Sequence, residues 1–308
     1  MNRHERCLAA IQGRPVDRPP RYLPGVACEV ASRVLGRPAH TGTGSLHYAE
    51  TCALMEGEAA HREFEEQLFE DVAAFNRAFD IEVYRIPWRQ RAKPARRVDE
   101  FTFVFGDPEN DHRIFKYDPG THEFGCVKTV SRCPLSPEDR LRQEVEAAER
   151  DIRNGRLSDL ALPADYRRVL EKYGREFFVV CNGGYISAGL DADDLMLIIT
   201  DPDWVRRKLW AQARRDAAFG RLLAGGPGGG VLLGGGDMAG NSGPFYSPAH
   251  FRDLMLPPLA HLVSALKAAG VHYIFRSDGD LRPVADMIFG EAGCPGYGEV
   301  DRLAGMTA

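Results

Sequence analysis

The second half of the chain alternates short apolar runs with longer segments of helical spacing, and this alternation limits the fold more than any other feature. Residues 177–181 (FFVVC) are continuously apolar, as expected for a strand that is buried on both faces. Shorter runs at 231–233 and 271–275 are each followed by a helical pattern. Strands and helices in this order predict a parallel α/β sheet that is covered by helices.

The remaining elements are predicted from periodicity and from turn residues. We expect strands at 21–26, 81–87 and 296–300, and a hairpin that joins 101–105 to 113–117. The stretch 41–45 (TGTGS) is interpreted as a flexible turn. Helices are expected at 3–12, 27–35, 59–79, 141–154, 165–173, 191–224, 248–269 (kinked at Pro257 and Pro258) and 281–289.

Composition and charge exclude several classes of protein. The 308 residues are 44% hydrophobic and 27% charged, which is ordinary for a globular domain. The net charge of −5 argues against nucleic acid as a partner. The basic run 89–97 is interpreted as a solvated loop, with contact to an anionic substrate or a partner as the alternative.

Cysteine usage and hydropathy indicate a cytoplasmic protein. The seven cysteines are odd in number and widely spaced, with no C-x-x-C pair, so reduced thiols are favoured over a disulfide framework. The amino terminus shows no signal peptide, and no uncharged apolar run reaches the ~18 residues of a membrane span.

Reactive groups of parallel α/β folds collect where the strands end, and residues 276–280 (RSDGD) are the most informative such segment. Asp278 and Asp280 are candidates for metal ligation, for orienting a substrate or for proton transfer. Arg276 is a candidate clamp for an anionic group. Asp280 has an alternative interpretation as the N-cap of the helix that follows it.

Other strand ends supply further candidates. Asp237 follows three glycines and is either a site residue or a turn residue. Asn182 and Tyr185 are expected to line a substrate pocket, whereas Cys181 is better explained as a buried structural thiol. Glu299 ends the last strand, so Glu299 and Asp278 together form a candidate metal pair. Asp301 is a candidate for the same pocket or for a turn cap.

Several segments in sequence order resemble the uroporphyrinogen decarboxylase superfamily. They are the opening ERCLAAIQGRPVDRPP, the strand end GGGDMA, the helix start SPAHFRDLMLPP and FRSDGD, and the resemblance extends from Arg3 to Met306. It implies a distorted (β/α)8 TIM barrel within a single domain, 1–308. The superfamily contains porphyrinogen decarboxylases and zinc-dependent, corrinoid-linked methyltransferases.

The methyltransferase branch matches better than the decarboxylases. The catalytic aspartate of the decarboxylases ends the second strand, where this chain has residues 86–88 (IPW), and Asp80 lies at the opposite end of that strand. The zinc ligands of the methyltransferases correspond to Arg276 and Asp278, and arginine cannot bind a metal. Either a Zn²⁺ ion is held differently, through Asp278 with Glu299 or Cys294, or none is bound.

The resemblance therefore predicts a corrinoid-linked methyltransferase that moves a methyl group between a small substrate or thiol and a corrinoid carried by a partner protein. Asp278, Arg276 and Asp237 are its predicted catalytic residues, and Asn182, Tyr185, Glu299 and Asp280 are its predicted substrate contacts. We count six barrel strands where the superfamily has eight, so we expect the last two strand–helix units to be missing or to come from a partner chain. A decarboxylase of porphyrin biosynthesis, a non-catalytic ligand-binding barrel and a homodimeric state remain open.

Overall fold

The computed structural model describes residues 1–132, 135–226, 228 and 230–307. These residues form two compact units. The first unit comprises Met1–Cys7, Val16–Pro134 and Arg175–Val179, and the second comprises Leu8–Pro15, Leu135–Gly174 and Val180–Ala308. No helix in the described part of the chain is long and apolar enough to cross a bilayer. The six cysteines within it are free thiols, and Cys133 lies outside it.

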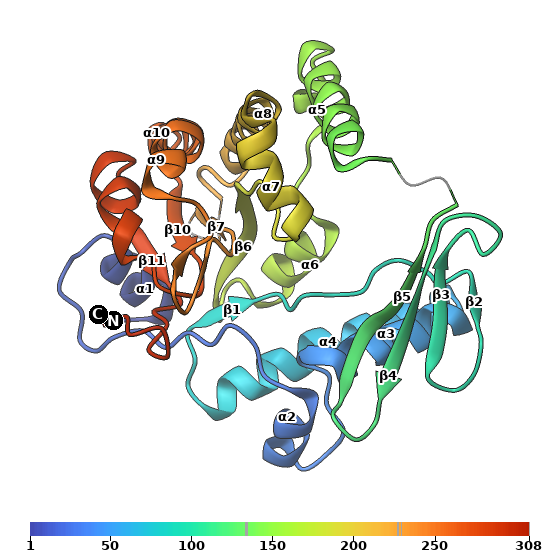
Figure 1. Ribbon diagram of the computed structural model, residues 1–308. Coiled ribbons are helices and arrows are strands. Elements are labelled where there is room, and N and C mark those ends of the chain that lie inside the picture. Colours follow the sequence, from blue (N-terminus) through green and yellow to red (C-terminus); the bar gives the residue numbers. More distant parts are fainter. Residues whose placement is uncertain (133–134, 227, 229, 308) are drawn as a thin grey trace. The chain divides into compact units, whose positions relative to one another are not determined.

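In the first unit, helices pack beside an antiparallel sheet (Figure 1). An aromatic cluster lies between α3 and this sheet. Phe103, Phe105, Tyr117 and Phe124 are buried, and Tyr48 stacks on Tyr117 with ring centroids 4.2 Å apart. The helices are α2 (Cys28–Leu35), α3 (Thr43–Glu56) and α4 (Glu58–Ala78), and α1 (Arg3–Ile11) contributes its residues up to Cys7 to this unit. The strands, in the order β2-β3-β4-β5, are β2 (Arg96–Arg97), β3 (Thr102–Gly106), β4 (His112–Asp118) and β5 (Glu123–Val130).

A curled parallel sheet has the strand order β1-β6-β7-β10-β11. Its strands are β1 (Val83–Arg85), β6 (Phe178–Tyr185), β7 (Val231–Gly235), β10 (His272–Arg276) and β11 (Gly296–Gly298). Within the second unit Ile274 pairs with Leu233 on one side and with Gly296 on the other. Five parallel strands in this arrangement are consistent with part of a TIM-like barrel.

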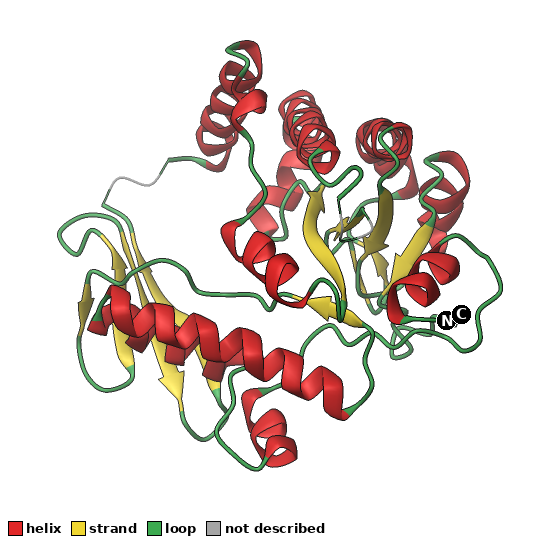
Figure 2. Cartoon of the chain, turned by 180° about the vertical axis from the view of Figure 1, so that it is seen from behind, coloured by secondary structure: helices red, strands yellow, loops and turns green. Residues whose placement is uncertain are grey.

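Helices cover one face of the strands in the second unit (Figure 2). Leu232, Tyr273 and Phe275 are buried, and the ring of Phe275 meets that of Phe289 edge-on at 6.4 Å. The helices are α5 (Pro137–Arg153), α6 (Ala164–Tyr173), α7 (Ala192–Thr200), α8 (Pro202–Arg221), α9 (Pro248–His250) and α10 (Leu256–Ala268). Short turns are 3-10 at η1 (Arg156–Asp159) and η3 (Arg282–Val284), and π at η2 (Phe251–Met255) and η4 (Asp286–Glu291). A small hairpin pairs β8 (Ala239–Gly240) with β9 (Gly243–Pro244).

The predicted strand at 21–26 is wrong, because this segment is irregular. Pro19, Pro20 and Pro24 lack the N–H groups that hydrogen bonds between strands need. In this segment only the carbonyl of Arg21 accepts backbone hydrogen bonds from the segment that leads into β1. That carbonyl accepts from the N–H of Glu82 at 3.2 Å. The described parallel sheet therefore has five strands and not the six that we counted.

The turn expected at 41–45 is also wrong, since helix α3 begins at Thr43. Gly44 lies inside this helix, and the residue there must be glycine because the backbone between β4 and β5 passes very close to it. A Cβ atom on Gly44 would lie 2.3 Å from the carbonyl oxygen of His122. The glycine that suggested a turn is instead required by packing.

Two predicted helices are interrupted. The helix expected at 248–269 is broken by the π turn η2 (Phe251–Met255), just before Pro257 and Pro258. Those prolines cannot donate to the carbonyls one turn earlier, so the ladder loosens there. The helix expected at 281–289 is replaced by η3 and η4. The hairpin at 101–117 is confirmed, and β2 and β5 extend it on either side.

Candidate functional site

The candidate site lies where β10 and β11 end. Side chains alternate along β10, so Phe275 is buried under the helices while Arg276 lies on the opposite face. Arg276 pairs in register with Gly298 of β11. A Cβ atom on Gly298 would lie 3.3 Å from Cγ of Arg276, so the glycine leaves room for the arginine stem.

Arg276 forms an ion pair with Glu299, the residue that follows β11. Its Nε donates to Oε1 of Glu299 at 2.8 Å, and its Nη2 contacts the same oxygen. Glu299 has φ of 73°, a left-handed backbone that glutamate rarely adopts. Such a conformation costs about 1–3 kcal/mol, and here it accompanies a carboxylate aimed at Arg276.

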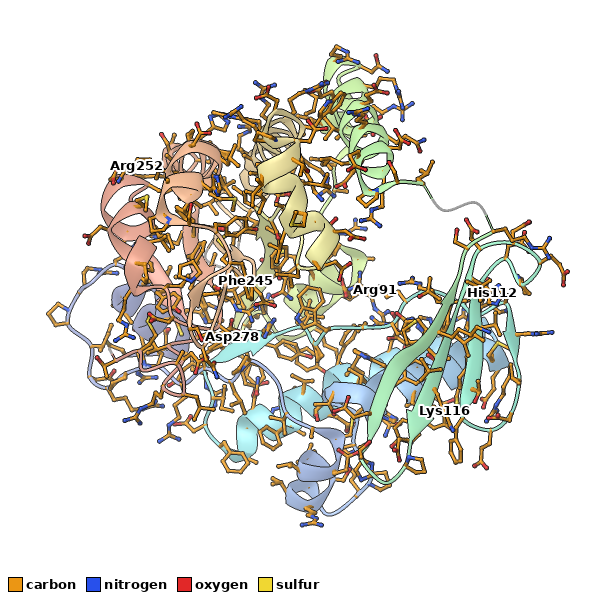
Figure 3. All side chains as sticks on the ribbon, in the orientation of Figure 1. Arg91, His112, Lys116, Phe245, Arg252 and Asp278 are labelled. Atoms are coloured by element: carbon orange, nitrogen blue, oxygen red, sulfur yellow. The ribbon has the colours of Figure 1, made fainter. Side chains whose placement is uncertain are left out.

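Asp278 has the most distinctive environment at this strand end. Its side chain, labelled in Figure 3, is exposed. Within the described part of the chain its carboxylate takes part in no hydrogen bond or ion pair. Partial burial raises the pKa of Asp278, the negative charges of Glu299 and Asp301 raise it further, and Arg276 opposes them. A carboxylate with a raised pKa at the end of a parallel strand is suited to proton transfer.

The neighbours of Asp278 hold the loop in place. Asp301 accepts from the N–H of Gly279 at 3.1 Å and from that of Leu303 at 2.9 Å. Asp280 accepts from the N–H of Arg282 at 3.0 Å, and both its oxygens bond the guanidinium of that residue. Asp280 thus closes a local turn with Arg282, whereas Leu281 occupies the N-cap position of η3. Asp237, predicted to be catalytic, is exposed in the loop after β7.

Asn182 and Tyr185 line a different part of the second unit. They border a cavity of about 800 Å³, and Arg276, Asp278 and Glu299 are not among the described residues of its walls. The sequence analysis missed a third residue of this wall, Asp216 on α8. The sequence does contain a signal for it: Asp216 interrupts a helical stripe of small and apolar residues, and a carboxylate on a buried helix face suggests a functional role. The buried residues of this stripe are Leu209, Ala213, Ala217 and Gly220.

The described residues do not fit a thiolate zinc site. They contain no group of three or more His, Cys, Asp or Glu side chains placed to hold a metal ion. Glu299 is already paired with Arg276. Cys294 is buried, and this burial raises its pKa to about 12, so the sulfur is a neutral thiol in the metal-free protein. We therefore assign no chemical step to zinc.

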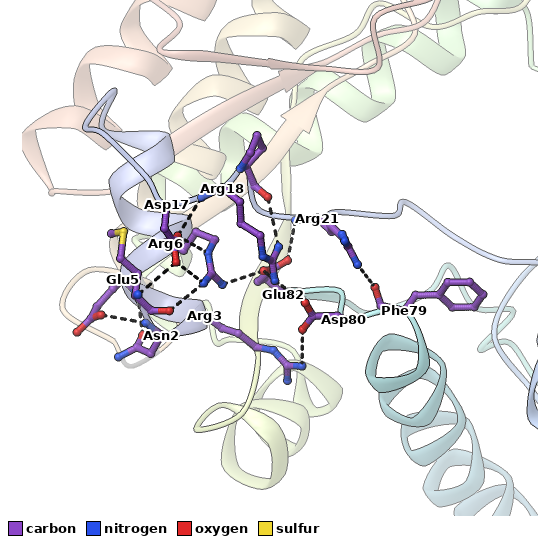
Figure 4. Close-up of polar contacts among 12 residues, drawn as sticks. Asn2, Arg3, Glu5, Arg6, Asp17, Arg18, Arg21, Phe79, Asp80 and Glu82 are labelled. Atoms are coloured by element: carbon purple, nitrogen blue, oxygen red, sulfur yellow. Dashed lines mark hydrogen bonds and ion pairs between the residues drawn. The ribbon is translucent and has the colours of Figure 1, made fainter.

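In the first unit, polar residues near β1 have structural roles. Asp80 pairs with Arg3 and Arg18, and the neighbouring Glu82 accepts from Arg6 and Arg18 (Figure 4). This network lies at the amino-terminal end of β1, as the sequence analysis expected for Asp80.

At the other end of β1, Arg89 corrects the prediction of a solvated basic run. Its side chain is only 2% exposed, and it pairs with Glu50 at 2.5 Å and Glu65 at 2.7 Å. Later members of the run, Arg91 and Lys93, are exposed as expected.

The fold and the site define an α/β protein with a curled parallel sheet whose polar residues gather at a carboxyl edge. The sequence matches no family model and no curated protein. Among solved structures it is similar to a methyltransferase from Methanosarcina mazei, with a TM-score of 0.54 and 15% identity. The alignment covers 96% of this chain and 75% of that one. At this identity the likeness concerns the fold alone.

Proposed function

We propose that this protein is a methyltransferase of the corrinoid-linked type, which acts at the carboxyl end of β10 and β11. The observation that carries the proposal is Asp278, an exposed strand-end carboxylate that is held among other carboxylates. The fold shared with a methyltransferase supports the same reading. A corrinoid on a partner protein would supply or accept the methyl group.

In this proposal Asp278 takes the proton of the small substrate. A corrinoid that supplies the methyl group would keep the electron pair of the carbon–cobalt bond as that bond breaks. The sulfur of the thiol would form the new bond to the methyl carbon, and its S–H proton would pass to the carboxylate of Asp278. Its raised pKa brings its basicity closer to that of the thiol, which favours this transfer. The pair of Arg276 and Glu299 has a positioning role, because it sets the charge that Asp278 experiences.

The test is methyl transfer from free methylcobalamin to 2-mercaptoethanol, followed by the loss of methylcobalamin absorbance. General acid–base catalysis contributes about 10²–10⁴-fold, so we expect Asp278→Asn to lower kcat/KM by about 100-fold or more. The same change should remove the acid limb of the pH profile. Asp193→Asn, a change to an exposed carboxylate in the first turn of α7, is the matched control and should leave the rate unchanged.

Two results would overturn the proposal. Turnover of uroporphyrinogen without methyl transfer would point to a decarboxylase. Methyl transfer that is equally fast in Asp278→Asn and in Asp193→Asn would remove Asp278 from the chemistry.

A further inference from the structure

The second unit contains a cavity that the proposed function does not use. It is bordered by α5, η1, α8 and the end of β6, is open to solvent on one side, and has a volume of about 800 Å³. Small-molecule sites commonly have volumes of about 300–1,000 Å³. The cavity is therefore large enough for a ligand of drug-like size.

Helix α5 gives this cavity an apolar wall. Leu141, Val145, Ala148 and Ile152 recur at helical spacing and form one stripe. The first two are buried, whereas Ala148 and Ile152 are half-buried and line the cavity together with Val145. The apolar face of α5 is thus only partly covered by α8, and the uncovered part faces the cavity.

The charged residues of the cavity wall balance one another. Three acidic and three basic side chains line it, and they form three pairs. The pairs are Glu144 with Lys208 at 3.1 Å, Asp151 with Arg156 at 3.0 Å, and Asp216 with Arg215 at 3.4 Å. Every opposite charge that a charged ligand could use is therefore already paired, so a neutral ligand that leaves the three pairs intact is favoured.

Asp216 supplies a buried hydrogen-bond acceptor in this wall. It is 6% exposed, and burial raises its pKa to about 6, against the opposing effect of Arg215 and of the backbone N–H groups of Tyr185 and Gly184. At neutral pH the carboxylate is therefore still mainly charged. Arg215, its ion-pair partner, has a side chain that is 64% exposed, so the pair is open to solvent on the arginine side. A carboxylate beside apolar surface recognises a ligand that donates a hydrogen bond.

We infer that this cavity binds a neutral, largely apolar small molecule that donates one hydrogen bond to Asp216. The inference does not rest on the proposed methyltransferase activity, because Asp278 does not line the cavity. The chemical class is a compact ring system or short chain with one hydroxyl or N–H group.

Four naphthalene probes test this inference by isothermal titration calorimetry at neutral pH on the full chain. They are 2-naphthol, 2-methoxynaphthalene, 2-naphthoate and 2-naphthylmethylammonium. A hydrogen bond to a charged group is worth about 1.5–3 kcal/mol, so 2-naphthol should bind about tenfold more tightly than its methyl ether. It should also bind more tightly than either charged probe.

Two substitutions locate the binding. Ala148→Trp directs an indole from α5 into the cavity and should abolish binding of 2-naphthol, whereas Ala192→Trp, on the exposed start of α7, should not. Asp216→Asn should lower the affinity for 2-naphthol by about tenfold and leave the affinity for the methyl ether unchanged. This second variant keeps the inference testable if Ala148→Trp does not fold. Tighter binding of a charged probe, unaltered binding in Asp216→Asn, or no binding of 2-naphthol to the wild type would each overturn it. Asp278→Asn should bind 2-naphthol normally, which separates this result from the proposed methyl transfer.

Discussion

Nε of Arg276 donates to Oε1 of Glu299 at 2.8 Å, and this pair controls the electrostatics around Asp278. Asp278 experiences two neighbouring carboxylates, Glu299 and Asp301, against the single cation of Arg276. Changing either member of the pair should therefore move the pKa of Asp278, and the two changes should act in opposite directions.

Glu299→Gln removes one of the negative charges near Asp278, so the pKa of Asp278 should fall. Arg276→Gln removes the opposing cation, so the same pKa should rise. Shifts of about one unit or less are expected for partly exposed groups. The titration of the Asp278 carboxyl ¹³C resonance measures both, and shifts of the same sign in the two variants would contradict the assigned electrostatics. If Asp278 acts as proposed, the acid limb of the rate profile should follow these shifts.

Asp216 makes the stability of the protein depend on pH. Burial raises its pKa from 3.8 to about 6, so the folded state holds this proton more tightly than the unfolded state does. The contribution of Asp216 to the free energy of unfolding is therefore greatest below about pH 4. It is lost as the pH rises through about 6, and the total change is about 3 kcal/mol. Asp216→Asn cannot ionise and should gain up to this amount relative to the wild type between pH 4 and pH 7.

Urea unfolding of both proteins across this pH range measures the difference. Asp193→Asn, which changes an exposed carboxylate, should follow the wild type at every pH. A gap between Asp216→Asn and the wild type that is constant with pH would contradict the raised pKa.

Glu82 should be far more important for stability than its neighbour Asp80. Glu82 is fully buried and accepts from Arg6 at 2.9 Å, from Arg18 at 2.6 Å and from the N–H of Arg21 at 2.7 Å (Figure 4). Glu82→Ala leaves buried Arg6 with one carboxylate partner fewer and should cost about 3–5 kcal/mol.

Asp80→Asn is the matched control, because Asp80 also pairs with Arg18 but its side chain is 53% exposed. Asparagine tolerates the φ of 50° at this position, so the change should cost about 1 kcal/mol or less. Thermal or urea unfolding compares the two, and equal losses would show that burial does not set the strength of this network.

Much of the parallel sheet could be predicted because local pattern and tertiary role agree there. Continuous apolar runs such as 177–181 are buried on both faces, and that requirement is visible in the sequence itself. The irregular segment around Arg21 and the helix beginning at Thr43 were missed for the opposite reason. Their structures depend on prolines that block pairing and on a glycine required by a distant backbone contact.

The candidate site was predictable only in part. The sequence placed RSDGD at the carboxyl end of a strand, as the structure does, but the partners of these side chains come from residues more distant in the chain. The sequence could not show that Glu299 would neutralise Arg276, nor that Asp301 would hold Gly279 and leave Asp278 exposed. The cavity beside Asp216 was missed because it is formed by the spacing between α5 and α8, which no local pattern encodes.

A comparison of Gly279, in the Asp278 loop, with Gly293, which precedes β11, allows a final prediction about how that loop is held. Gly279 and Gly293 both have positive φ, of 83° and 71°, so alanine is strained at either position by about 1–2 kcal/mol. A Cβ atom on Gly293 would meet nothing within 4 Å, whereas one on Gly279 would lie 2.5 Å from the carbonyl of Ala239 in the β8–β9 hairpin. Gly279→Ala should therefore destabilise the protein by about 1–3 kcal/mol more than Gly293→Ala, because backbone must move to admit the methyl group. Urea unfolding measures the free energy of unfolding of both variants. Equal decreases would mean that the β8–β9 hairpin shifts without cost and does not fix the position of Asp278.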